Sequence, residues 1–112
     1  MNTQINFMIT HLPEMRQLAQ RYMEILAPAA VAGAKLASER FEILSNFNFM
    51  SFLWGSQLQA GALKLDVDDI NILDDSIAVL TTMEPYYKQF KGDDLLNFIM
   101  LNNALGRAVT LL

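Results

Sequence analysis

The polar side chains near the C-terminus are the candidates in this sequence for holding a small ligand. Asn103 and Arg107 are four residues apart, so they share one face if their segment is helical. The residues around them are mainly apolar, and an arginine in an apolar pocket can hold an anion through charge-assisted hydrogen bonds. Tyr86 and Tyr87 would add hydroxyl groups to such a pocket. A structural role is favoured over this ligand site. In that role Arg107 forms an internal salt bridge with an aspartate, or the asparagines fix the register of an oligomer.

Five aspartates lie between Asp66 and Asp75 and at first sight suggest a calcium-binding loop. The spacing is wrong, because Asn71 stands where the loop needs glycine and Ile77 where it needs a bidentate glutamate. Aspartates are common at helix starts, where they accept hydrogen bonds from free N–H groups and oppose the helix dipole. The segment therefore predicts a helix start. A weak divalent-cation site, or an acidic docking surface for a basic partner, is the alternative.

Groups for acid–base or nucleophilic catalysis are scarce. The chain has no cysteine, which excludes thiolate nucleophiles and cysteine-built zinc sites. His11 is the only histidine, so any Ser-His-Asp arrangement would have to use it, and it lies two residues before Pro13 at a predicted helix start. We expect no enzymatic activity, no metal site and no cofactor.

Aromatic residues concentrate between Asn46 and Trp54. The favoured interpretation is a short helix that contributes to the core. The alternative is a recognition surface, in which Phe49, Phe52 and Trp54 would act as anchors. No basic residue is interleaved with these rings, which argues against single-stranded nucleic acid as the ligand.

A second possible interface consists of small residues that would let another backbone approach closely. They fall on one side of a predicted helix over residues 29–44 and comprise Ala30, Gly33, Ala34 and Ala37. Packing within the chain is favoured over a dimer seam.

The segments that would position these residues are all predicted to be helices. Apolar residues at helical spacing predict helices over 13–27, 29–44, 46–60 and 66–84. Pro28 is expected to end or kink the first, and Gly61 to lie near the end of the third. Residues 1–12 and 62–67 fit either a helix or an extended segment.

The last predicted helix begins after Gly92 with two aspartates suited to a helix start. From Leu95 to Leu112 its only charged side chain is Arg107. A helix that is apolar nearly all round is buried, either at the centre of a domain or in an oligomer. We therefore expect a compact all-α bundle of about five helices, a single domain over residues 1–112, with a buried C-terminal helix.

Composition indicates a binding role. Hydrophobic residues make up 53% of the 112-residue chain and charged residues only 18%, against a usual charged share of about 25%. Some apolar surface should therefore remain outside the core of a monomer, to be covered by self-association or by a partner. The net charge of -4, with scattered basic residues, argues against nucleic-acid binding.

These observations favour a non-enzymatic helical interaction protein, homo-oligomeric, that modulates a partner protein as an adaptor or inhibitor. The alternative function is binding of a small anionic ligand or nucleotide near Asn103 and Arg107. We expect a cytoplasmic location, because no signal peptide is evident, and no membrane span, because the longest uncharged stretch, Ile43 to Leu63, is too polar.

Overall fold

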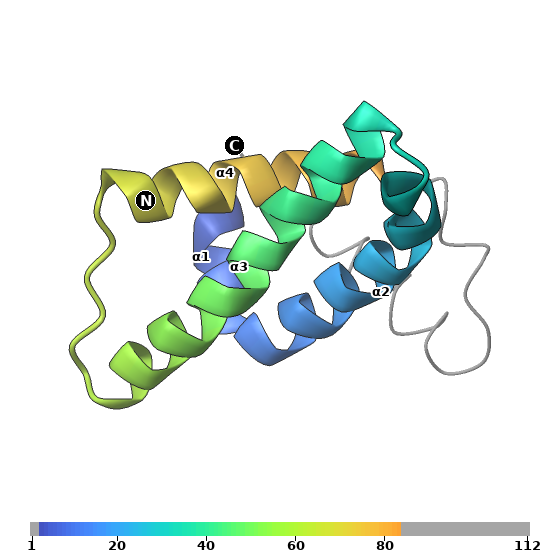
Figure 1. The fold of residues 1–112 in the computed structure, drawn as a ribbon. Helices are drawn as coiled ribbons and strands as arrows, with labels where there is room; N and C mark the ends of the chain where they lie inside the picture. The colour runs from blue at the N-terminus through green and yellow to red at the C-terminus, as the bar shows by residue number, and fades with distance from the viewer. Residues whose placement is uncertain (1–2, 84–112) are drawn as a thin grey trace.

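The computed structural model describes residues 3–83, which form four α-helices. These are α1 (Thr3–Thr10), α2 (Leu12–Val31), α3 (Lys35–Gln59) and α4 (Val67–Thr82). Figure 1 shows α4 along the top, α3 running diagonally in front of α4 and α1, and α2 below α3. Residues 3–83 contain no strand, so the all-α prediction is confirmed for this range. The predicted C-terminal helix lies outside the described residues.

The N-terminal segment, which the sequence leaves open, is helical. Ile5, Met8 and Ile9 of α1 are buried at the spacing of one helical face, and Leu12, which begins α2, is also buried. His11 is the single residue between the two helices. Pro13 lies in the first turn of α2, where its missing N–H leaves no helix bond unmade.

Of the two expectations for Pro28, that it ends the helix is wrong, because α2 continues through this proline to Val31. The break comes at Gly33, which has a φ of 91°, a left-handed conformation that favours glycine. Its N–H donates to the Ala30 carbonyl at 3.1 Å, and the Ala34 N–H donates to the Ala29 carbonyl at 3.0 Å. These bonds close the end of α2 as a Schellman motif. A Cβ at Gly33 would meet nothing within 4 Å, so this glycine serves the turn rather than a close helix contact.

The two helices expected over 29–44 and 46–60 are largely one helix, α3. Ser45 and Asn46 are weak helix formers, but they lie between Leu44 and Phe47, which are both buried. Packing of this inner face outweighs the local preference and keeps the helix continuous. The helix ends just before Gly61, near the predicted position. Gly61 has a left-handed φ of 68°, and the N–H groups of Gly61 and Ala62 close the helix end with the same pattern of hydrogen bonds as in α2.

The aspartates at the start of α4 cap the helix as predicted. Asp66 Oδ1 accepts from the Asp69 N–H at 2.9 Å, and Asp69 Oδ2 accepts from the Asp66 N–H at 3.1 Å. This reciprocal pair is a capping box. Residues 62–66 before it are irregular, and their Leu63 and Leu65 side chains pack, partly buried, against the core.

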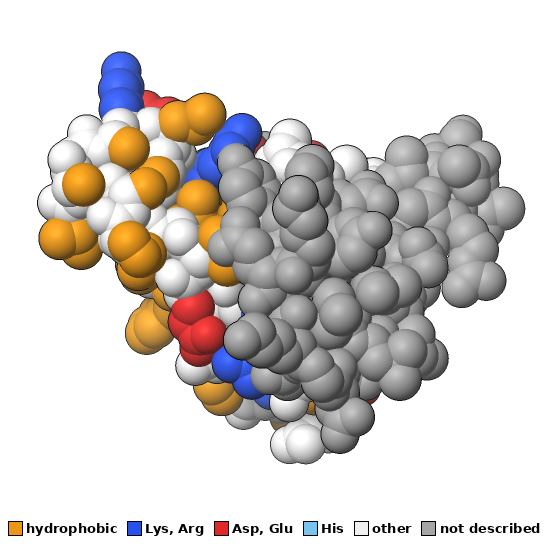
Figure 2. Space-filling view, turned by 90° about the vertical axis from the view of Figure 1, so that its right-hand side faces the viewer, with side chains coloured by type: hydrophobic (Ala, Val, Ile, Leu, Met, Phe, Trp, Pro, Cys, Tyr) orange, Lys and Arg blue, Asp and Glu red, His pale blue; other side chains and the backbone are white. Residues whose placement is uncertain are grey.

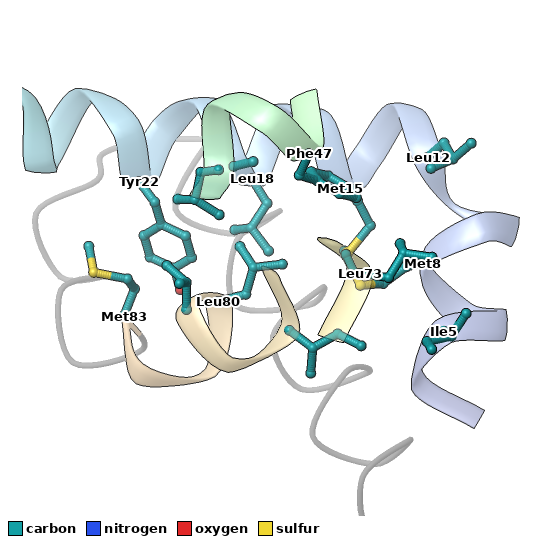
Figure 3. Packing of buried hydrophobic residues seen from close by; sticks show 14 of the residues in the cluster. Ile5, Met8, Leu12, Met15, Leu18, Tyr22, Phe47, Leu73, Leu80 and Met83 are labelled. Atoms are coloured by element: carbon teal, nitrogen blue, oxygen red, sulfur yellow. The ribbon is translucent and has the colours of Figure 1, made fainter. Parts of the chain in front are cut away.

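The core lies between the facing sides of the helices. α2 packs along α3, while α4 contacts both α3 and α1. Figure 3 shows Leu18 and Tyr22 of α2 facing the α4 side chain Leu80 and the adjoining Met83. None of the described helices has the length and apolarity that a membrane crossing requires.

Candidate protein-interaction surface

The inner face of α3 is fixed by the core. Its buried residues recur mostly at three- or four-residue spacing and are Ala37, Leu44, Phe47, Ser51 and Trp54. The rings of Phe47 and Trp54 are 6.1 Å apart and tilted by 55°, an arrangement that aromatic pairs favour. These contacts set the rotation of α3 about its axis and therefore determine which side chains face outward.

The opposite face of α3 carries two phenylalanines and a leucine that are exposed to solvent. The exposed fractions are 76% for Phe49, 65% for Phe52 and 47% for Leu53. Residues three and four apart are neighbours on a helix surface, so Phe49 adjoins both of the others. We call this group of three the outer stripe. The stripe also has no charged neighbour along α3 after Glu42, since no charged residue occurs between Glu42 and Lys64.

Arg16 of α2 lies at the edge of the outer stripe. Its guanidinium carbon is 4.4 Å from the centre of the Phe52 ring, a cation–π contact, and its Nη1 donates to the Ser51 carbonyl at 3.3 Å. Other basic residues within 3–83 do form ion pairs, Arg21 with Glu24 and Lys35 with Glu39. No carboxylate of this part of the chain pairs with Arg16. The site thus combines an apolar surface with one positioned cation.

The aromatic residues predicted as anchors divide between the two faces of α3. Phe49 and Phe52 belong to the outer stripe, whereas Trp54 is fully buried and is part of the core. The signal that separates them is the helical period over the whole of 35–59, which the assumed break near Asn46 obscures. Sequence reasoning missed Arg16, because its contact with Phe52 joins two helices and has no local pattern.

The predicted small-residue interface does not lie on one helix, because the turn at Gly33 divides it. Ala30 is half-buried near the end of α2, Gly33 and Ala34 are exposed in the turn, and Ala37 is buried in α3. Figure 2 views the end of the molecule where α2 and α3 join, and hydrophobic side chains are scattered over its described part. Val31 and Leu36 are 88% and 57% exposed at this end.

His11 is engaged in local structure. Its Nδ1 donates to the Phe7 carbonyl at 2.9 Å, because a carbonyl oxygen can only accept, and its ring stacks on Phe7 with centroids 4.2 Å apart. Over residues 3–83, histidine and carboxylate side chains nowhere gather in threes in a way that could hold a metal ion. The predicted ligand-binding residues Tyr86, Tyr87, Asn103 and Arg107 lie outside the described residues.

Comparison with known proteins does not place the chain in a family. No family model matches the sequence, and neither curated proteins nor solved structures gave a match. A function must therefore be inferred from the residues of the chain itself.

Proposed function

We propose that this chain is a non-enzymatic interaction protein that binds a partner protein through the outer stripe of α3. The observation that carries the proposal is that the exposed Phe49 adjoins the exposed Phe52 and Leu53 on a face to which α3 itself contributes no charged residue after Glu42. The solvent face of a helix usually carries charged and polar residues. Clustered apolar side chains on a surface mark interaction sites, and aromatic residues supply much of the binding energy at such sites.

The size of the outer stripe suits a reversible interaction. A buried aromatic side chain covers about 150–250 Å². The exposed fractions of Phe49 and Phe52 therefore offer about 280 Å² of aromatic surface. At about 25 cal/mol per Å² this surface contributes about 7 kcal/mol before the costs of association are subtracted. Those costs are about 4–15 kcal/mol, so we expect a modulator that binds and releases its partner rather than a permanent subunit.

The engagement of His11 supports binding over catalysis. The Nδ1–H of the only histidine in the chain bonds to the Phe7 carbonyl and the ring stacks on Phe7, so a local structural role accounts for this residue. The low share of charged residues supports the same view, because it leaves apolar surface for a partner to cover.

The test compares wild type with the double variant Phe49→Ser/Phe52→Ser. The matched control is Val31→Ser/Leu36→Ser, which removes exposed apolar side chains from the α2–α3 end instead. Circular dichroism should show equal helix content in all three proteins. Binding of a hydrophobic dye, and capture of a partner from the source cells, should fall only in the Phe49→Ser/Phe52→Ser protein.

Light scattering after size exclusion tests the predicted homo-oligomer separately. A wild-type protein that stays monomeric at tens of micromolar, binds no hydrophobic dye and captures no partner would contradict the proposed function. Equal loss of binding in both double variants would also contradict it, because the outer stripe would then have no special role.

A further inference from the structure

We propose that the partner presents an amphipathic helix with an acidic residue beside its apolar side chains, and that Arg16 selects that acid. This inference rests on the proposed function of the outer stripe. It goes further by naming the chemistry of the occupant and a specificity-determining residue. The observation behind it is the juxtaposition of Arg16 with Phe52 and the absence of a carboxylate paired with Arg16 within residues 3–83.

Arg16 is held in position before any partner arrives. The Phe52 ring and the Ser51 carbonyl fix its guanidinium at the edge of the outer stripe. A guanidinium has five N–H donors, and one of them bonds to Ser51, so others remain for an incoming carboxylate. Because the side chain is already ordered, binding removes less of its conformational freedom than binding to a mobile arginine would.

The surface fits a helix better than an extended peptide. No strand occurs in residues 3–83, so this part of the chain offers no sheet edge to which a peptide strand could be added. Phe49 and Leu53 form a ridge along α3, and Ser45 and Ser56, at the two ends of this ridge, have short side chains. Apolar residues repeated every three or four positions on a partner helix can pack beside such a ridge.

Charge argues against a second copy of this chain as the occupant. In a twofold dimer centred on Phe52, each Arg16 would lie near the Arg16 of the other copy. Glu42 cannot compensate, because it lies ten residues from Phe52, about 15 Å along the helix axis. Glu14 is two residues from Arg16, and such residues do not face each other on a helix. A partner that supplies a carboxylate avoids this repulsion and pairs with the cation.

The experiment uses the full chain and two synthetic helical peptides of about 20 residues, long enough to be helical in isolation. Both peptides carry leucines at positions i, i+3, i+4 and i+7, and they differ only in having glutamates or lysines beside the leucines. Binding is measured by fluorescence anisotropy at low and high salt. We expect wild type to bind the glutamate peptide about tenfold more tightly, with a preference that weakens in high salt.

Charge reversal at Arg16 provides the sharpest variant. Arg16→Glu should prefer the lysine peptide, while Arg16→Lys keeps the cation and should keep a weaker preference for the glutamate peptide. Arg16→Gln, which should lose the preference for the glutamate peptide, replaces Arg16→Glu if the latter loses helix content. The net charge of -4 favours the lysine peptide in general, so a preference for glutamate in wild type must arise locally.

The outcomes separate this inference from the proposed function. Equal binding of both peptides, lost in Phe49→Ser/Phe52→Ser, would overturn selection by Arg16 while supporting the outer stripe as a binding surface. A wild-type dimer that becomes monomeric in the same double variant would show that a second copy is the occupant, and would overturn the inference in the same way. Failure of both peptides to bind at about 1 mM would refute the helical partner.

Discussion

Phe47 and Phe49 are the same residue type two positions apart on α3, yet their environments are opposite. Phe47 is fully buried against Trp54, whereas Phe49 is 76% exposed. Truncating a buried phenylalanine to alanine costs about 3–5 kcal/mol, because apolar contacts are lost and a cavity remains. Phe47→Ala should therefore remove about a fifth or more of the free energy of unfolding expected for a small domain, about 5–15 kcal/mol.

The same substitution at Phe49 should cost far less. Only about a quarter of this side chain is buried, so the loss scales to about 1 kcal/mol. The better helix propensity of alanine offsets about half of that. For a domain of this size, each 1 kcal/mol shifts the unfolding midpoint by about 4 °C. Phe47→Ala should lower the midpoint by about 12–20 °C and Phe49→Ala by about 2–4 °C.

Thermal and urea unfolding followed by circular dichroism at the helix band measure both costs. The fluorescence of Trp54 is the wrong readout for this pair, since Phe47 contacts its ring and the substitution changes the signal directly. Equal destabilisation by the two substitutions would refute the orientation of α3 that buries Phe47 and turns Phe49 outward, and with it the exposure of the outer stripe.

Three further substitutions test other parts of the structure. Gly33→Ala should destabilise by about 1–2 kcal/mol, because the φ of Gly33 is left-handed. If Gly33 instead lay inside a helix, the same change would stabilise by about 1 kcal/mol, so the sign of the change in unfolding free energy, measured in urea, decides between the two. Asp66→Ala should cost about 0.5–2 kcal/mol of unfolding free energy through loss of the capping box, and Asp66→Asn should retain most of the cap. Trp54→Phe should cost less in thermal unfolding than the about 3–5 kcal/mol of Trp54→Ala, because it keeps much of the ring volume and removes a buried indole N–H that has no acceptor in residues 3–83.

Local chemistry allowed some elements to be predicted from the sequence. The aspartates from Asp66 cap α4, Gly61 follows the end of α3, and Pro13 lies in the first turn of α2, because each residue type suits a helix end through its own backbone or side chain. The buried stripe of α2, including Met15, Leu18 and Tyr22, also follows directly from its helical spacing.

Features that depend on distant contacts could not be predicted in this way. Pro28 has no N–H to donate within α2, yet the following turn still forms, since the Pro28 carbonyl accepts from the Ala32 N–H at 3.1 Å. The continuity of α3 through Ser45 and Asn46 depends on packing of its inner face against α2 and α4. Dividing α3 near Asn46 hides the opposite placement of Phe49 and Trp54, because their positions on one helical period are then lost.

The approach of Arg16 to Phe52 needs three-dimensional information of another kind. The two residues belong to different helices and are 36 positions apart, and neither has a neighbour in sequence that indicates the contact. From the sequence, the aromatic segment is therefore only the less favoured alternative for a recognition surface, and the cation at its edge is not indicated at all.

The exposure of the outer stripe can be tested most directly by thiol reactivity, because the chain contains no cysteine of its own. Ser56→Cys places a thiol on the outer face of α3, and Ser51→Cys places one on the buried face with the same small change in structure. The Ser56→Cys thiol should react with a thiol reagent at the rate of an unfolded control. The Ser51→Cys thiol should react at least about a hundredfold more slowly, because the reagent reaches it only when the helix opens. Similar rates at the two positions would contradict an outward-facing stripe on α3.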